Sequence, residues 1–241
     1  MISVCMAVYN GEKYIYQQIE SILAQIDSSD EIVVSDDGSS DKTLEIIRSF
    51  DDTRIVLISN TSRRGLVENI ENALVNARGD YIFLADQDDV WVSTRVSAVL
   101  HLLQIYDLVI SDCYVVDSGL NILKDSLFRI NNSSPGFVKN LIKNSYVGCC
   151  MAFNRKILKS VLPFPRYIPM HDWWIGLVCE YRYKTCFIND KLVYYRRHFS
   201  NISDTSSFSS SSFFLKLRWR MLLVIALVDR FVLSLIRKKY V

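Results

Sequence analysis

The chain has 241 residues, half of them hydrophobic, and a formal net charge of +2. That length allows one large domain or two small ones with a packed core. Carboxylates occur in pairs in the first half, whereas Arg and Lys gather after position 182. No basic array with interleaved aromatic residues and no nucleic-acid motif is present, which argues against a nucleic-acid partner.

The six cysteines lack the C-x-x-C spacing and the His-rich neighbours of zinc sites. They also do not form the framework of a disulfide-rich secreted protein, so a reducing cytosol fits best. The chain opens on a strand-like segment instead of a charged region, an apolar segment and a cleavage site. We therefore expect a cytoplasmic protein.

Short apolar, β-branched segments alternate with segments of helical periodicity in the first half of the chain. Strands are predicted at residues 2–8, 32–35, 54–58, 81–85 and 108–111, and helices at residues 13–25, 42–50, 67–77 and 93–105. This alternation predicts an α/β fold with a mostly parallel sheet flanked by helices.

Polar residues follow four of these strands, at residues 9–10, 36–39, 86–89 and Asp112. Because ligands collect outside the carboxyl ends of such strands, these residues predict one acidic pocket. Asp86, Asp88 and Asp89 repel one another unless solvent, a basic side chain or a cation such as Mg²⁺ or Mn²⁺ offsets their charge. The alternative is an acidic turn that caps a helix beginning near Trp91.

The second half is less regular. Residues 131–136 are typical of a loop, residues 171–181 predict an aromatic helix, and residues 185–188 and 191–195 predict a pair of strands. A Ser-rich linker is predicted at residues 204–212.

The last segment, residues 213–241, is apolar and basic. Its longest uninterrupted apolar part, residues 221–228, is far shorter than the roughly 20 residues that a membrane span needs. It predicts an amphipathic helical extension that lies on a membrane surface, with cations facing anionic headgroups. The alternative is a helix packed on the protein's own core or on a second subunit.

Six groups of residues resemble, in this order and spacing, the motifs of family 2 glycosyltransferases, which are inverting enzymes of the GT-A fold. They are residues 3–11 (SVCMAVYNG), 32–41 (IVVSDDGSSD), Gly65 with Asn69, 79–91 (GDYIFLADQDDVW), 171–174 (HDWW), and 195–198 (YRRH) with Asn201. The sequences DQDD and HDWW are most similar to bacterial rhamnosyl- and glucosyltransferases of surface polysaccharide (O-antigen or capsule) synthesis. The resemblance implies a Rossmann-like GT-A domain over residues 1–203, with a nucleotide-sugar half (1–112) and an acceptor half (113–203).

The resemblance implies a nucleotide-sugar site at the ends of the first strands. Tyr9 offers a ring for stacking on a nucleobase, and Asp37 offers an acceptor for an imide N–H of uracil or thymine. A plain turn before the helix at residue 42 is the alternative for residues 36–39. The full set of expected contacts is Ala7, Tyr9, Asn10, Glu12, Asp36, Asp37, Gly38, Arg64, Asn69, Asp86, Gln87 and Asp88.

Asp86 and Asp88 resemble the D-x-D motif, which holds the nucleotide sugar through a divalent metal, Mn²⁺ or Mg²⁺. Asp88 is expected to bind the metal directly, and Asp86 to contact the ribose or the metal through water. The resemblance implies that His198 lies near the diphosphate and the metal. Asp89 is expected to cap the helix that follows Trp91.

Asp172 matches the family's catalytic carboxylate, which takes the proton from the attacking hydroxyl. Many members carry Glu-Asp where this chain has His171-Asp172, so His171 either contacts the acceptor or positions the aspartate. Of Trp173 and Trp174, one is expected to line the acceptor site and one to pack in the core.

Three further residues are expected near the acceptor or the diphosphate. Gly148 matches a small-residue segment that faces the acceptor pocket. Arg196 and Arg197 follow a strand and suit a diphosphate on donor or acceptor, and their alternative is a strand edge with solvated cations.

Together these features predict transfer of a hexose from a nucleoside diphosphate sugar, UDP-glucose or UDP-galactose first and dTDP-rhamnose second. The expected acceptor is a saccharide carried on a polyprenyl diphosphate at the cytoplasmic face of the membrane, and a homodimer is a further expectation. A non-catalytic scaffold that binds nucleotide sugars is the first alternative, and Asp172 argues against it. A metal-dependent nucleotidyltransferase is the second, but no Gly-rich phosphate loop follows the first strand.

Overall fold

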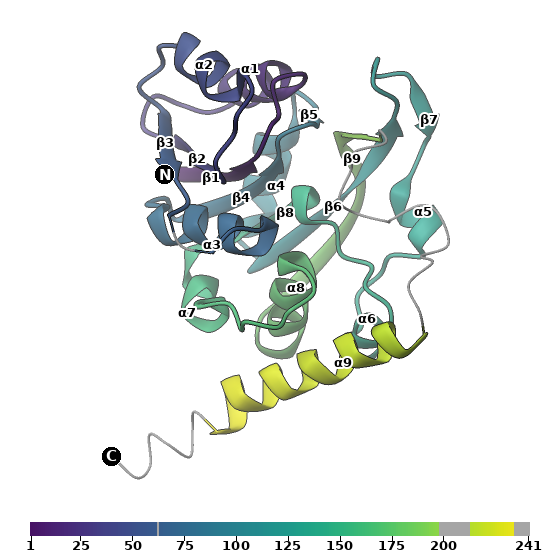
Figure 1. Cartoon of the computed structure of the whole chain (residues 1–241). Helices are drawn as coiled ribbons and strands as arrows, with labels where there is room; N and C mark the ends of the chain where they lie inside the picture. The colour runs from purple at the N-terminus through teal and green to yellow at the C-terminus, as the bar shows by residue number, and fades with distance from the viewer. Residues whose placement is uncertain (62, 198–212, 234–241) are drawn as a thin grey trace.

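The computed structural model describes residues 1–61, 63–197 and 213–233 (Figure 1). Its strands are β1 Ile2–Val8, β2 Glu31–Asp36, β3 Ile55–Ser59, β4 Tyr81–Asp86, β5 Val90–Trp91, β6 Leu108–Val116, β7 Ile122–Lys124, β8 Met151–Asn154 and β9 Thr185–Arg196. The α-helices are α1 Ile15–Leu23, α2 Thr43–Ser49, α3 Leu66–Asn76, α4 Arg95–Leu103, α5 Leu127–Asn131, α6 Phe137–Ile142, α7 Leu158–Val161, α8 His171–Arg182 and α9 Phe213–Val228. Short 3₁₀ turns occur at Gly148–Cys150 (η1) and Arg155–Ile157 (η2), and a π-helical turn at Asp229–Leu233 (η3).

All strands join one mixed sheet in the order β3-β2-β1-β4-β8-β6-β9-β5, and β7 pairs with β6. β3, β2, β1 and β4 are parallel, and β1, β2 and most of β4 are buried, as their continuous apolar segments predicted. In Figure 1, α3 and α8 lie in front of the sheet and α4 behind it. The predicted α/β architecture is therefore confirmed.

The strand register brings the predicted polar ends together. Ala7 pairs with Asp86 on one side and with Ser35 on the other, and Val8 pairs with Asp36. Residues that follow β1, β2 and β4 consequently emerge at one edge of the sheet, where the sequence predicted a pocket.

Two elements differ from the sequence prediction. The strand pair predicted at residues 185–188 and 191–195 is a single strand, β9, in which Asn189 and Asp190 form a bulge against β6. Val90 and Trp91 pair with β9 instead of starting a helix, and α4 begins only at Arg95. Both errors arise because long-range pairing overrides local turn and helix signals.

The sheet does not divide at the predicted boundary between the two halves. Residue 112 lies inside β6, and β8 runs antiparallel between β4 and β6, so one sheet extends across both halves. The division into a nucleotide-sugar half and an acceptor half stays a prediction about where the ligands bind.

The helix α9 crosses the lower side of the molecule beneath α6 and α8 (Figure 1). Leu223, Ala226, Leu227 and Phe231 are buried on the side that faces the body. Within the described residues, no helix is long and apolar enough to cross a membrane. The predicted linker at 204–212 and the final residues 234–241 lie outside the described part of the chain.

Candidate active site

The acidic loop, defined as residues 86–89, starts at the last residue of β4 and is held from two sides. Gln18 Nε2 on α1 donates to the Asp86 carbonyl at 2.8 Å. Arg196 at the end of β9 donates through Nε to the Asp88 carbonyl at 2.7 Å and through its backbone N–H to Asp89 Oδ1 at 2.9 Å. Helix α1 and strand β9 therefore fix the position of the loop.

A third anchor lies inside the loop. Gln87 accepts from the Tyr9 backbone N–H at 2.9 Å and donates to the Tyr9 carbonyl at 3.1 Å. A Cβ on Gly11 would lie 2.5 Å from Gln87 Oε1, so only glycine leaves room for this side chain. The amide of Gln87 binds the backbone of Tyr9 and couples the end of β1 to the acidic loop, and the predicted contact of Gln87 with the nucleotide sugar stays a prediction.

Asp37, the predicted contact of the nucleobase, accepts two hydrogen bonds from the protein. Its Oδ1 accepts from Asn60 Nδ2 at 2.8 Å and its Oδ2 from the Gly65 N–H at 2.9 Å. Each carboxylate oxygen has a second lone pair, so the group keeps acceptor capacity for a ligand. Tyr9, on the neighbouring strand end, keeps 51% of its surface exposed.

Asp36, another predicted contact of the nucleotide sugar, holds the turn that follows β2. It is buried, and its carboxylate accepts from the N–H groups of Gly38 at 3.0 Å and Ser39 at 3.2 Å. It therefore shapes the turn after β2, and Gly38 there adopts φ +89°. Arg64 reaches this turn, because a Cβ on Gly38 would lie 3.2 Å from its NH2 group.

Two other predicted contacts hold the loop between β1 and α1 to the start of α2. Asn10 Oδ1 accepts from the Ser40 N–H at 2.8 Å, and Asn10 itself has φ +48°. Glu12 Oε2 accepts from the Lys42 N–H at 3.0 Å. Both side chains are exposed beside Tyr9, and in the structure they bind backbone groups.

Asn69 and Ala7 lie beneath the nucleotide side of the site. Asn69 is buried on α3 and donates to the Val8 carbonyl at 3.1 Å. Ala7 is buried in β1, one residue from this contact. Both residues therefore support the strand end that carries Tyr9.

The carboxyl groups of the acidic loop are electrostatically strained. Burial, and then the charges of Asp88 and Asp172, raises the pKa of Asp86 to about 7. Burial also raises the pKa of Asp89 well above its usual range, and its Oδ2 has no hydrogen-bond partner within the described residues. The predicted helix cap is wrong for Asp89, because its other oxygen binds Arg196 and α4 starts later in the chain.

This cluster fits a cation. Ligand atoms of Asp86, Asp89 and Cys149 lie within 4.8 Å of one another. Carboxylate oxygens suit hard ions such as Mg²⁺ and Mn²⁺, whereas a thiol suits softer metals, so the oxygens are the relevant ligands. No local sequence signal indicated Cys149 here, because η1 meets β4 only in the folded chain. His198, the other predicted metal ligand, lies outside the described residues.

Asp172 lies in the first turn of α8 and is only 7% exposed. Its Oδ1 accepts from the Trp173 N–H at 2.6 Å and from Asn144 Nδ2 at 3.4 Å. Burial raises its pKa to about 6, which leaves the group ionised at neutral pH. A Cβ on Gly148 would lie 3.6 Å from Asp172 Cβ, and the neighbouring Cys149 clusters with Asp86, so the two carboxylates flank the same short turn, η1.

His171 is buried beside Asp172. Burial lowers its pKa to about 4, so the ring is neutral at pH 7. Neither ring nitrogen has a hydrogen-bond partner within the described residues. A Cβ on Gly148 would lie 2.8 Å from His171 Nε2, so glycine provides the room for the ring. The structure thus brings the predicted Gly148, His171 and Asp172 together.

Both tryptophans after Asp172 are buried, although the sequence predicted one of them at the acceptor. Trp173 Nε1 donates to the Asn140 carbonyl at 2.7 Å, and Trp174 Nε1 donates to the Val161 carbonyl at 2.9 Å. Each indole therefore fastens α8 to a neighbouring segment, because its only polar atom binds a backbone carbonyl.

Arg196, predicted to contact the acceptor or a diphosphate, is bound within the protein in this structure. It is 1% exposed, donates to the Ser118 carbonyl at 2.5 Å and to Gln17 Oε1 at 2.9 Å, and stacks over Tyr14 at 4.3 Å. Arg197 is half-buried, with its guanidinium 5.2 Å from the centre of the Tyr195 ring. The sequence shows that Arg196 and Arg197 are charged, but it does not show how far the fold buries them.

Asp112 is also outside the predicted pocket. It is buried within β6, where its carboxylate accepts from Ser126 Oγ at 2.5 Å and from the Phe128 N–H at 2.9 Å. It therefore organises the start of α5.

Comparison with known proteins identifies the family. The model of the family described as "Glycosyl transferase family 2" matches residues 3–162, which include the acidic loop. The chain belongs to glycosyl transferase family 2. This confirms the resemblance found in the motifs.

Two of the proteins similar in sequence to this chain are named bacterial glycosyltransferases. The chain is 30% identical over 207 residues to WfaP of Escherichia coli, a "UDP-Glc:alpha-D-GlcNAc-diphosphoundecaprenol beta-1,3-glucosyltransferase", and the match covers 84% of this chain and 80% of WfaP. It is 26% identical over 221 residues to the "dTDP-rhamnosyl transferase RfbG" of Shigella flexneri, covering 81% of this chain and 72% of RfbG.

Solved structures confirm the GT-A fold. TarS 1-349 of S. aureus, in complex with UDP-GlcNAc, superposes with a TM-score of 0.73 at 17% identity, covering 96% of this chain and 67% of TarS 1-349. Glucosyl-3-phosphoglycerate synthase of Mycobacterium tuberculosis, crystallised with Mn²⁺, UDP and glucosyl-3-phosphoglycerate, gives a TM-score of 0.60 at 18% identity, covering 95% of this chain and 79% of that one.

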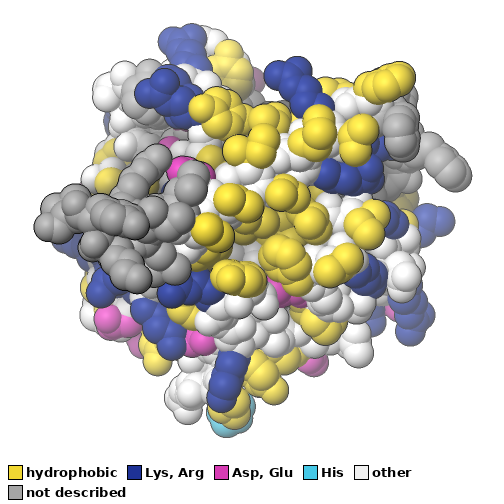
Figure 2. Space-filling model, turned by 90° about the horizontal axis from the view of Figure 1, so that it is seen from below, with side chains coloured by type: hydrophobic (Ala, Val, Ile, Leu, Met, Phe, Trp, Pro, Cys, Tyr) yellow, Lys and Arg dark blue, Asp and Glu magenta, His cyan; other side chains and the backbone are white. Residues whose placement is uncertain are grey.

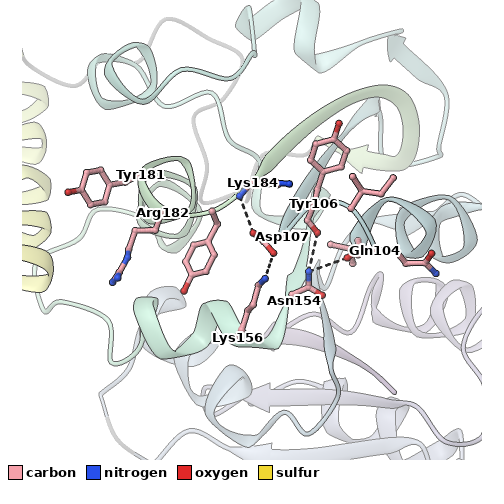
Figure 3. Close-up of a pocket in the computed structure, with 11 residues that line it drawn as sticks. Gln104, Tyr106, Asp107, Asn154, Lys156, Tyr181, Arg182 and Lys184 are labelled. Carbon is pink, nitrogen blue, oxygen red and sulfur yellow. Dashed lines mark hydrogen bonds and ion pairs between the residues drawn. The ribbon is translucent and has the colours of Figure 1, made fainter.

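A cavity of about 560 Å³ lies away from this glycosyltransferase site (Figure 3). It opens beside the first residues of β6 and β9, at the opposite end of these strands from Arg196. Lys156 pairs with Asp107 at 2.5 Å inside it, and the Lys184 N–H donates to the same carboxylate at 3.0 Å. That carboxylate is therefore already paired, and the cavity is not part of the candidate active site.

Proposed function

We propose that this family 2 member is a metal-dependent inverting enzyme that transfers a hexose from a nucleoside diphosphate sugar to a polyprenyl-diphosphate-linked saccharide. One observation carries the proposal: a Cβ on Gly148 would lie 3.6 Å from Asp172 Cβ, and the next residue, Cys149, clusters with Asp86 and Asp89 of the acidic loop. A base and a diphosphate-binding region therefore share one site, as a single displacement requires.

Asp172 acts as the general base in this proposal. Its pKa of about 6 leaves it ionised at neutral pH, yet basic enough to accept a proton as the acceptor hydroxyl attacks. The hydroxyl oxygen bonds to the anomeric carbon while the bond from that carbon to the diphosphate breaks. The proton moves to Asp172, the electron pair leaves with the nucleoside diphosphate, and the anomeric configuration inverts.

The acidic loop is proposed to provide the carboxylates that bind the metal ion. Asp88 and Asp86 would hold Mn²⁺ or Mg²⁺ with His198, and Asp89 would be close by, because its ligand atom clusters with those of Asp86 and Cys149. When bound, the cation offsets the negative charge that develops on the departing diphosphate. The buried, mutually repelling carboxylates support this assignment, because a cation relieves the repulsion that raises the pKa of Asp86.

Tyr9 and Asp37 are proposed to bind the nucleobase. The exposed ring of Tyr9 is available for stacking, and Asp37 keeps a lone pair on each oxygen for an imide N–H. Uracil and thymine carry that imide, so UDP- and dTDP-sugars both fit. Arg64, whose guanidinium is beside Gly38, is proposed to contact the diphosphate or the base.

The named relatives support the order of preferred donors. WfaP uses UDP-Glc with a diphosphoundecaprenol-linked acceptor, and RfbG is a dTDP-rhamnosyl transferase. UDP-glucose or UDP-galactose is therefore proposed first, dTDP-rhamnose second, with the acceptor at the cytoplasmic membrane face. A homodimer stays a prediction.

A panel of UDP-, dTDP- and GDP-sugars with Mn²⁺ tests the function, with nucleoside diphosphate release and NMR of the product anomer as readouts. We expect a UDP-hexose to be preferred and the anomeric configuration to invert. Asp172→Asn should keep donor binding but lower kcat at least about a hundredfold, and Asp88→Ala should lose metal-dependent donor binding. A near-normal kcat in Asp172→Asn would reassign the base, and retention of configuration would refute the mechanism.

A further inference from the structure

The helix α9 has a second apolar side that the body of the protein does not cover. Hydrophobic residues spaced three or four apart are exposed along it, and η3 continues the row. We call these residues the apolar face: Phe214, Leu217, Met221, Val224, Ile225, Val228 and Val232. Figure 2 shows hydrophobic side chains gathered across this lower side of the molecule.

The opposite side of α9 is fixed to the body by two arginines. Arg220 Nε donates to the Ile142 carbonyl at the end of α6 at 2.7 Å. Arg230 donates to the carbonyls of Leu162, at 2.7 Å, and Pro163, before α8. Any surface that the apolar face contacts therefore sets the orientation of the whole molecule.

Charge around the apolar face is mostly positive. Besides Arg220 and Arg230, which bind the body, residues 213–233 contain Lys216 and the exposed Arg218 against one carboxylate, Asp229. Lys139 on α6 adds to these cations. In Figure 2, Lys and Arg side chains border the hydrophobic area and few carboxylates are visible.

We infer that the apolar face docks on the surface of an anionic lipid bilayer, with α9 lying in the plane of the interface. Hydrophobic side chains then enter the acyl boundary while the bordering cations contact anionic headgroups. A second copy of the chain fits less well, because pairing two apolar faces would bring their bordering cations together.

The docked orientation places the acceptor half next to the lipid. The helix α6, which Arg220 binds, also accepts the indole N–H of Trp173 through the Asn140 carbonyl, and Trp173 follows Asp172 directly. This step alone rests on the proposed function: an acceptor anchored in lipid would reach Asp172 from the side that carries α9.

Sedimentation of the full chain with lipid vesicles tests the docking without any activity measurement. We expect binding to vesicles of phosphatidylglycerol mixed with phosphatidylcholine, and much weaker binding to phosphatidylcholine alone. Ile225→Asp should weaken binding at least about tenfold, because a 58% exposed apolar side chain becomes a carboxylate. Arg218→Glu should weaken binding only to the anionic vesicles.

The matched control is Ile122→Asp, which changes a 55% exposed isoleucine on β7, far from α9 in Figure 1. It should bind vesicles like the wild type, and circular dichroism checks the fold of every variant. Equal binding by Ile225→Asp and the wild type would overturn the inference. So would a wild-type dimer in sedimentation equilibrium that Ile225→Asp dissociates, because a second copy would then occupy the face. Transfer to a soluble acceptor tests the proposed function separately.

Discussion

Replacing Arg196 with methionine should loosen the acidic loop without touching any proposed ligand. The guanidinium donates to the carbonyls of Asp88 and Ser118 and to Gln17 Oε1 at 2.5–2.9 Å, and all three bonds are part-buried. A hydrogen bond from a charged donor contributes about 1.5–3 kcal/mol. Methionine fills part of the volume, and water can reach some of the carbonyls.

We therefore expect Arg196→Met to lower the free energy of unfolding by about 3–5 kcal/mol. Typical domains have about 5–15 kcal/mol, so the variant should still fold at low temperature. With the Asp88 carbonyl released, the Mn²⁺ concentration for half-maximal activity should rise about tenfold or more, while the KM of the acceptor stays unchanged. Arg196→Lys keeps one donor and should recover part of the metal affinity.

Arg54→Met is the matched control. Arg54 also donates to backbone carbonyls, those of Leu23 at 3.0 Å and Ile26 at 2.6 Å, but at the opposite end of the parallel strands. It should reduce stability, as measured by urea unfolding, and leave the Mn²⁺ dependence unchanged. Equal Mn²⁺ dependence in wild type and Arg196→Met would refute the positioning role. A raised acceptor KM with normal metal dependence would restore the diphosphate contact that the sequence predicted.

Two further predictions concern the base and the nucleotide. The acid limb of the pH–rate profile should have its midpoint near pH 6, because Asp172 must be ionised and its pKa is raised to about 6. Activity is then lost as the pH falls through that value. Asn144→Ala removes a hydrogen bond that favours the charged form, so the limb should move to higher pH, and an unchanged or lowered midpoint would contradict this. Gln87→Ala removes two hydrogen bonds to Tyr9, about 2 kcal/mol, and should weaken UDP binding about thirtyfold in calorimetry. Unchanged UDP affinity would show that Gln87 does not position Tyr9.

The sequence predicted the parallel part of the sheet well because local signals and tertiary structure agree there. Each buried parallel strand is a continuous apolar segment, and a polar residue marks its end. The strand β9 was predicted as two strands because Asn189-Asp190 resembles a turn, whereas the chain accommodates both residues in a bulge against β6. Pairing with a distant strand determines that outcome.

The candidate site, like the sheet, was predicted only where local sequence signals determine it. The types of residue in the motifs indicated carboxylates for a metal and a base, and the fold places Asp86 and Asp172 within electrostatic reach. What each polar side chain binds could not be predicted. Asp36, Gln87 and Arg196 bind backbone groups that are remote in sequence or belong to a turn whose shape the sequence leaves open.

The three residues that hold the acidic loop come from distant parts of the chain, so the loop connects several elements of the site. Gln18 holds it to α1, Gln87 holds it to the end of β1, and Arg196 holds it to β9. The strand β9 directly follows α8, the helix that begins beside Asp172. Displacement in one step needs the base and the departing diphosphate on opposite sides of one carbon, within a few tenths of an ångström of the productive geometry. Arg196 ties the acidic loop to the strand that follows α8, so its loss should impair the proposed reaction even where every proposed ligand is intact.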